Sequence, residues 1–329
     1  MRNAVWIALI VLGAVLAPHV WAQDTALIDP IATLEAGDFR ALAVTADGAR
    51  LLIADAASNQ VRVYDISDPA DPKPLVSLEV QGTPIDLAAS NDFALVLVET
   101  GGETDLIEVI APADYDPRAL YATVTYIDVP TGARHVRLSP DGDWGIVVGN
   151  GGYTLLEMLS ASEVNSSAFI DVPAFNDGVP TNSRVLVASG GEPSIQSAPL
   201  QAQSQSVEGL TLDAPARLLA LNERGTLGAA LLENGEVVFF DPAEMRLVGS
   251  QLLSQRDVLA LRFAALEAGE WLLVAEADAT AITLLDVSDL EDIGEIGARP
   301  LNIQVRTLTV WGDLLFVTDG QRIEIYGIG

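Results

Sequence analysis

Histidine and cysteine, which carry most nucleophilic catalysis and most transition-metal binding in proteins, are nearly missing from this chain. There is no cysteine, and the two histidines are His19 and His135. Because His19 falls in a predicted signal peptide, any Ser-His-Asp triad would need His135, which no Gly-x-Ser-x-Gly turn accompanies. Metal centres that need a pair of histidines are excluded as well. The sequence therefore assigns no catalytic residue and favours a protein without enzymatic activity.

Carboxylates are plentiful, and they leave an oxygen-ligated metal site open. The chain has 46 Asp plus Glu, and Ca²⁺ takes about six to eight oxygen ligands. The densest acidic run, residues 65–71, is either a calcium site or a turn, since Asp and Ser after a strand commonly cap turns. A divalent ion in a central channel would have other candidate ligands: Asp86, Asn150, Glu233 and Asp257. Such an ion, with Ca²⁺ as the cofactor, would make the protein a metal-dependent hydrolase or lactonase.

Arginine recurs at one position relative to a repeated tight turn. Four arginines each stand seven residues before such a turn, in alternate repeat units: Arg40, Arg134, Arg217 and Arg306. If this position begins the innermost strand of each unit, the four form a positive collar at one mouth of a central channel. The second strands end at the same face, in acidic or amide residues: Asp55, Glu99, Asn150, Glu233, Glu276 and Asp319. Either the two sets pair and tie neighbouring units together, or the guanidinium groups bind an anionic ligand.

The turns themselves set the architecture, because they recur before strongly apolar strands at intervals of about 44 residues. They are Asp47-Gly48, Asn91-Asp92, Asp141-Gly142, Arg224-Gly225, Ala268-Gly269 and Gly312-Asp313. One interval is nearly twice as long, which places a hidden unit between residues 175 and 212 with its second strand at residues 183–189. Period-two alternation between these turns predicts four-stranded antiparallel meanders.

The two ends of the chain predict that the array closes on itself. The last unit stops at Gly329 after three strands, whereas residues 31–37 resemble a fourth strand. A closed ring hides the sheet edges that an open array would expose. We therefore predict an all-β fold, a seven-bladed β-propeller of four-stranded antiparallel blades closed by an N-terminal strand. Trp144 and Trp271 occupy equivalent positions and are predicted to pack between blades.

Several segments resemble known propeller repeats. Tyr64-Asp-Ile-Ser-Asp-Pro69 and Leu285-Asp-Val-Ser-Asp289 resemble the LVIVD repeat of secreted bacterial propellers. Leu138-Ser-Pro-Asp-Gly-Asp-Trp144 resembles the YVTN and WD40-like repeats. The resemblance implies a β-propeller of the surface or periplasmic type and no particular reaction, because the shared residues belong to turns.

The N-terminus and the charge indicate where the protein works. Residues 1–22 combine a basic start, an apolar run and a small-residue site at Ala22, which predicts a cleaved signal peptide and a single propeller domain at residues 23–329. The expected location is secreted or periplasmic, with no membrane insertion after cleavage. The net charge of −29 argues against nucleic acid as a partner.

These observations favour an exported, non-enzymatic, monomeric binding or scaffold module. Its ligand, an unknown protein or a small anion, would bind at one face of the propeller, and no cofactor is expected. The metal-dependent hydrolase described above is the alternative. A structural surface protein that needs salt to screen its charge is a third interpretation.

Overall fold

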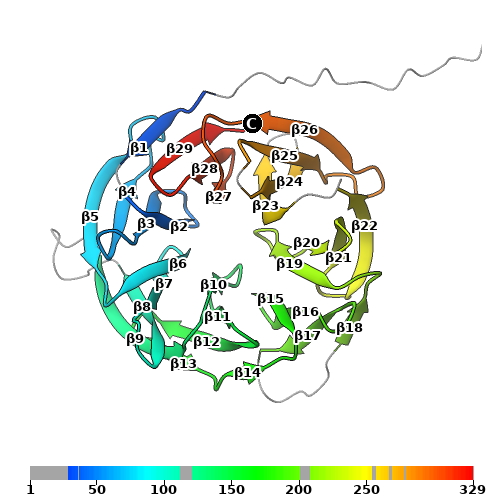
Figure 1. Cartoon of the computed structure of the whole chain (residues 1–329), viewed down its shortest axis with the longest axis horizontal. Helices are drawn as coiled ribbons and strands as arrows, with labels where there is room; N and C mark the ends of the chain where they lie inside the picture. Colours follow the sequence, from blue (N-terminus) through cyan, green and yellow to red (C-terminus); the bar gives the residue numbers. More distant parts are fainter. Residues whose placement is uncertain are drawn as a thin grey trace, which may run out of the picture.

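Seven antiparallel sheets stand radially around a central opening in the computed structural model (Figure 1). The structure describes residues 29–35, 37–111, 121–200, 208–253, 257–266, 269–277 and 279–328. The predicted seven-bladed all-β propeller is thereby confirmed. No helix in these ranges is long and apolar enough to cross a membrane. The predicted signal peptide lies outside the described residues.

Blades are numbered along the chain, and the first strand of each blade lies nearest the centre. Blade 1 holds β2 (Phe39–Val44), β3 (Arg50–Asp55), β4 (Gln60–Asp65) and β5 (Lys73–Glu79). Blade 2 holds β6 (Thr83–Ala89), β7 (Ala94–Glu99), β8 (Thr104–Ala111) and β9 (Ala122–Pro130). Blade 3 holds β10 (His135–Leu138), β11 (Trp144–Gly149), β12 (Gly152–Ser160) and β13 (Glu163–Ser166), and a short fifth strand, β14 (Ile170–Asp171), also pairs with β12.

The hidden unit is blade 4, which holds β15 (Phe175–Pro180), β16 (Arg184–Ser189), β17 (Ser194–Pro199) and β18 (Glu208–Thr211). Blade 5 holds β19 (Ala216–Leu221), β20 (Gly228–Leu232), β21 (Glu236–Asp241) and β22 (Arg246–Leu252). Blade 6 holds β23 (Val258–Leu266), β24 (Gly269–Glu276), β25 (Ala281–Asp286) and β26 (Gly294–Pro300). Blade 7 holds β27 (Thr307–Trp311), β28 (Leu314–Thr318), β29 (Arg322–Gly327) and β1 (Ala32–Glu35).

The N-terminal strand closes the ring. β1 pairs with β29 in antiparallel register, with Ala32 opposite Ile325 and Glu35 opposite Arg322. The outer edge of blade 7 is therefore made by residues from the opposite end of the chain, as Figure 1 shows where the blue and red strands lie side by side. This arrangement confirms the predicted closure.

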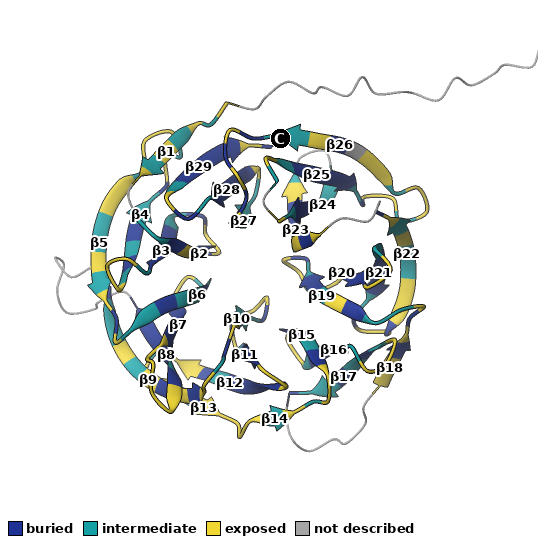
Figure 2. Ribbon diagram, in the orientation of Figure 1, coloured by how far each residue is buried: buried dark blue, intermediate teal, exposed yellow. Residues whose placement is uncertain are grey.

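The hydrophobic core is divided into seven clusters, one between each pair of neighbouring blades in the described part of the chain. The second strand of each blade is largely buried, and the third strands are mostly buried except β4 and β17, which alternate between buried and half-buried residues. The outer strands are the most exposed (Figure 2). Trp144 packs against the cluster between blades 3 and 4, and Trp271 against the one between blades 6 and 7. Both tryptophans thus pack between blades, as predicted.

The similar acidic segments that follow β4 and β25 form turns. The Asp65 carboxylate accepts hydrogen bonds from the Ser67 amide at 3.0 Å and the Ser67 hydroxyl at 2.7 Å, and these bonds lower the pKa of Asp65. In blade 6, Asp286 accepts a hydrogen bond from the Ser288 amide at 3.0 Å. The same Asx turn therefore follows the third strand of both blades.

Candidate anion-binding channel

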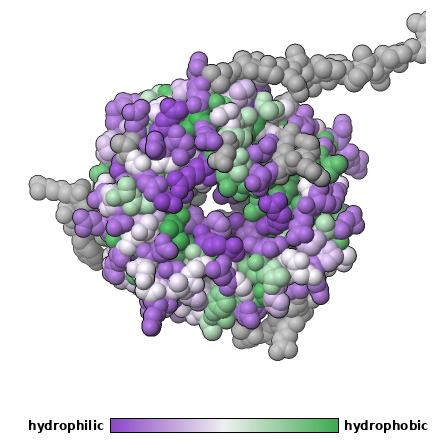
Figure 3. Space-filling model, viewed as in Figure 1, coloured by the Kyte–Doolittle hydropathy of each residue, from purple (hydrophilic) through white to green (hydrophobic). Residues whose placement is uncertain are grey.

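A continuous channel of about 680 Å³ runs through the centre of the ring and is lined by the first strands of all seven blades. Figure 3 shows the opening in the middle of one face, with hydrophilic side chains around it. The lining residues run from Arg40 and Arg306, where the first strands begin, to Pro140 and Glu223 beyond the ends of the first strands. We call the end near Arg40 and Arg306 the mouth of the channel.

A β-bulge lies where the first strand begins in five of the seven blades, and the residues at this position surround the mouth. In five blades the register shifts across one residue: Arg40, Ile85, Asn176, Arg217 and Leu259. In blades 3 and 7 the equivalent residues are Arg134 and Arg306, whose amides donate to Val148 and Thr318. These seven residues form the mouth ring. Bulges commonly re-aim a side chain, and here two of the four predicted collar arginines, Arg40 and Arg217, stand at bulges.

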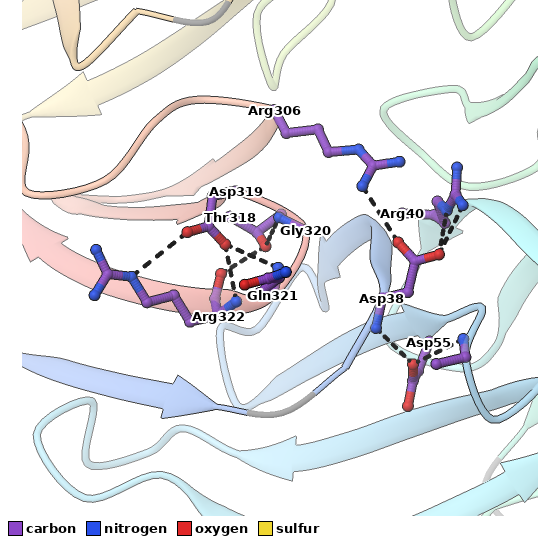
Figure 4. Close-up of polar contacts among 10 residues, drawn as sticks. Asp38, Arg40, Asp55, Arg306, Thr318, Asp319, Gly320, Gln321 and Arg322 are labelled. Carbon is purple, nitrogen blue, oxygen red and sulfur yellow. Dashed lines mark hydrogen bonds and ion pairs between the residues drawn. The ribbon is translucent and has the colours of Figure 1, made fainter.

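Two of the four arginines share a single carboxylate. Asp38 Oδ2 accepts a hydrogen bond from Arg40 Nη2 at 2.6 Å, and Asp38 Oδ1 lies 3.2 Å from Arg306 Nη1 (Figure 4). The Asp38 amide in turn donates to Asp55 Oδ1 at 3.0 Å. Arg40 and Arg306 are therefore held at the junction of blades 1 and 7.

The other two arginines are held more loosely. Arg134 Nη2 reaches the Gly149 carbonyl at 3.4 Å, a long hydrogen bond. Arg217 Nη2 lies 3.7 Å from Asp257, whose side chain is 82% exposed. Both guanidinium groups are thus solvent-accessible at the mouth. Neither is among the residues that line the channel itself.

Pairing between the mouth arginines and the second-strand acids, one of the two sequence hypotheses, takes a different form in the structure. Asp55 is buried and pairs with Arg62, a residue of its own blade. Asp319 pairs with Arg322, also within one blade. Asp38, which precedes the first strand, is the acid that joins neighbouring blades at Arg40 and Arg306.

The four candidate metal ligands do not share one place. Asp86 lines the channel, whereas Asn150, Glu233 and Asp257 are not among the lining residues. Asp86 Oδ2 accepts the Val136 amide at 2.9 Å and lies 3.3 Å from His135 Nδ1. Among the described residues, no three His, Cys, Asp or Glu side chains form a group that could hold a metal ion.

Sequence reasoning missed a second ring, three residues further along each first strand. This inner ring lines the channel and contains Ala43, Ala88, Arg137, Val179, Ala220, Arg262 and Thr309. Its two arginines stand three residues after Arg134 and Leu259. That spacing, once the bulge is known, is the signal that would have found them.

Arg137 joins three neighbouring blades. Its Nη1 lies 3.1 Å from both carboxylate oxygens of Asp177 in blade 4. The same nitrogen donates to the Gly178 carbonyl at 3.0 Å and to the Leu219 carbonyl of blade 5 at 3.3 Å. Asp177 itself accepts the Leu219 amide at 2.8 Å. The charge of Arg137 is therefore paired with the carboxylate of Asp177.

Comparison with known proteins identifies the fold. No family model and no curated protein matches the chain. Hsv2 from Kluyveromyces marxianus superposes with a TM-score of 0.64 at 12% identity, over 89% of this chain and 98% of that chain. Hsv2 from Kluyveromyces lactis gives a TM-score of 0.62 at 14% identity, over 87% and 91%. At such low identity the likeness shows the propeller fold alone. The resemblance to LVIVD and YVTN repeats stays a prediction.

Proposed function

We propose that this chain is an exported, non-enzymatic binding module, and that Arg134 and Arg217 hold an anionic group of its ligand at the channel mouth. The observation that supports the proposal is the unequal engagement of the four mouth arginines. Arg40 and Arg306 share Asp38, whereas in the described part of the chain Arg134 contacts only a carbonyl and Arg217 lies 3.7 Å from the exposed Asp257. Exposed guanidinium groups recognise carboxylates and phosphates through paired hydrogen bonds.

The position of these two arginines suits a shared ligand. Arg134 belongs to blade 3 and Arg217 to blade 5, so the bulge residue between them is Asn176 of blade 4. The side-chain Nδ2 of Asn176 donates a hydrogen bond to the Ala216 carbonyl at 2.8 Å. The side-chain oxygen of Asn176 takes no part in this bond. On a chain of net charge −29, a local pair of cations is the feature that would attract an anion. Export rests on the sequence of residues 1–22.

The double variant Arg134→Ala/Arg217→Ala tests the proposal, with citrate as the probe and NaCl of equal ionic strength as the blank. We expect citrate to bind the natural protein and the double variant to bind at least about tenfold more weakly, with an unchanged circular dichroism spectrum. Isothermal titration calorimetry measures the affinity. Arg246→Ala is the matched control, because Arg246 pairs with Glu244 on the outer surface of blade 5.

Two results would contradict the proposal. Equal citrate binding by the double variant and the natural protein would show that citrate does not bind at the mouth. Unfolding of the double variant would assign Arg134 and Arg217 to bracing the blades instead.

A further inference from the structure

We propose that the interior of the channel binds a small free oxyanion, such as inorganic phosphate or sulfate, beside Arg262 of blade 6. This site is distinct from the mouth. The inner ring lies three residues beyond the mouth ring, which is about 10 Å along a strand. Two observations carry the inference: the space at the inner ring and the lack of an ion-pair partner for Arg262.

The inner ring leaves room for a ligand. Five of its seven positions hold short side chains: Ala43, Ala88, Val179, Ala220 and Thr309. Arg137 and Arg262 are the two long ones. Arg137 is drawn toward blades 4 and 5 by its bonds to Asp177 and to the Leu219 carbonyl. The channel volume at this level is therefore not filled by the ring itself.

Arg262 has no carboxylate partner of its own. Its Nη1 donates to the carbonyl of the preceding residue, Leu261, at 2.9 Å. No ion pair of the described chain includes Arg262, although Asp86 and Asp177 are near enough to act on its charge. A guanidinium carries five N–H donors, so most of its hydrogen-bonding capacity remains for another group.

The two nearby carboxylates are already committed. Asp86 accepts the Val136 amide and Asp177 accepts the amides of Gly178 and Leu219, so both tie neighbouring blades together. Asp177 is also the ion-pair partner of Arg137. Asp177 uses both of its oxygens and cannot turn to Arg262 without losing one of these bonds, and Asp86 is held by Val136 through Oδ2.

The energetics favour an added anion. Burial in the channel wall, and then the charge of Arg137, lower the pKa of Arg262. Arginine keeps its proton in proteins, so this direction reflects the cost of holding a cation there. Of the described residues that line the channel, four are arginines: Arg40, Arg137, Arg262 and Arg306. Asp38 pairs with Arg40 and Arg306, and Asp177 pairs with Arg137, so Arg262 is the one lining arginine of the described chain without an ion pair. An oxyanion beside Arg262 supplies that partner and accepts its free N–H groups.

The decisive variant is Arg262→Gln in the mature chain, compared with Arg246→Gln as a matched control on the outer surface. Sodium sulfate and sodium phosphate are the probes, and NaCl at equal ionic strength is the blank. Thermal melting and isothermal titration calorimetry are the measurements. We expect sulfate or phosphate to raise the melting temperature of the natural protein and of Arg246→Gln beyond the NaCl blank. Arg262→Gln should lose that rise and bind at least about tenfold more weakly.

Arg262→Gln also has an expected behaviour without any ligand. It should melt no lower than the natural protein, because it removes a partly buried cation that has no ion-pair partner. The mouth variant Arg134→Ala/Arg217→Ala should keep the sulfate response, which separates this site from the proposed mouth site. Vesicles that contain phosphatidic acid present phosphate on a membrane and should not bind, because the inner ring lies well below the mouth.

Four results would overturn the inner site. They are no gain over NaCl in the natural protein, an equal gain in Arg262→Gln, loss of the gain in the mouth variant, or vesicle binding that depends on Arg262.

Discussion

Arg306 and Asp38 are 268 residues apart in the sequence, and their side chains form an ion pair at 3.2 Å. The same carboxylate binds Arg40, so Asp38 connects the last blade to the first at the channel mouth. This polar junction lies beside the pairing of β1 with β29 in the closing blade. The ring is therefore closed by the pairing of β1 with β29 and by the carboxylate that Arg40 and Arg306 share.

Asp38→Asn should destabilise the protein by about 1 kcal/mol, because it removes the charge that two arginines share. The Asp38 amide still donates to Asp55, so the backbone of the junction is kept. The side chains are about one-third to two-fifths exposed, and salt screens such pairs, so the difference should shrink in high NaCl. Urea unfolding at low and high salt measures it. Glu244→Gln, in an exposed pair within blade 5, is the control, and an equal loss there would contradict the role of Asp38.

Removing the charge of Glu108 should stabilise the folded protein. This fully buried residue of β8 accepts hydrogen bonds from the Gln81 amide and the Thr123 hydroxyl, and no ion pair of the described chain includes it. Burial raises the pKa of Glu108, although the two hydrogen bonds act in the opposite direction. Ionisation therefore costs folding energy, so the contribution of Glu108 to stability is greatest below its unfolded pKa of about 4.3 and is lost as pH rises through its folded pKa.

Glu108→Gln should accordingly raise stability at pH 7 by of order 1 kcal/mol and leave it nearly unchanged at pH 4. Melting temperatures at the two pH values measure the effect. Glu79→Gln, at an exposed position of β5, is the control. A variant that is less stable than the natural protein at pH 7 would show that the charged form of Glu108 is the one the fold favours.

Removal of divalent ions should leave the melting temperature unchanged. The acidic run at residues 65–71 uses its oxygens to cap a turn, with Asp65 bound to Ser67 and Asp68 bound to the Ala70 amide. Thermal melting in EDTA and in millimolar Ca²⁺ measures this. A higher midpoint that requires Ca²⁺ would revive the metal-dependent hydrolase as an interpretation.

The propeller could be predicted from sequence because its turns are chemically explicit. Gly48, Gly142 and Gly225 have φ of +69°, +79° and +65°, a region that favours glycine, so the turns recur visibly. Blade 4 is hidden because its first turn has neither Asp-Gly nor the Asn-Asp pair of blade 2, although its hydroxyl plays the same part as Ser90 does there. The Thr181 hydroxyl accepts the amides of Ser183 and Arg184, and no glycine is needed.

The candidate sites were less predictable. The spacing to the turn placed Arg134 correctly at the start of a first strand, but it could not show which residues of that strand face the channel. Arg262 stands in the same register as small residues of other blades, so no repeat marks it. The sequence also does not show which partner a long side chain binds. Arg40, for example, binds Asp38 and not Asp55.

The mouth ring has an odd number of positions, one for each of the seven blades. Arginine occupies every second blade, and an alternating pattern cannot close on an odd number of blades, so two arginine-bearing blades must meet somewhere. They meet where the chain ends meet, at Arg306 and Arg40, and they share one carboxylate, Asp38. Across blades 3 to 5 the engagement is different, because Arg217 lies 3.7 Å from Asp257 and Arg134 bonds only a carbonyl among the described residues. A ligand drawn to Arg134 would approach off-axis, away from the seam.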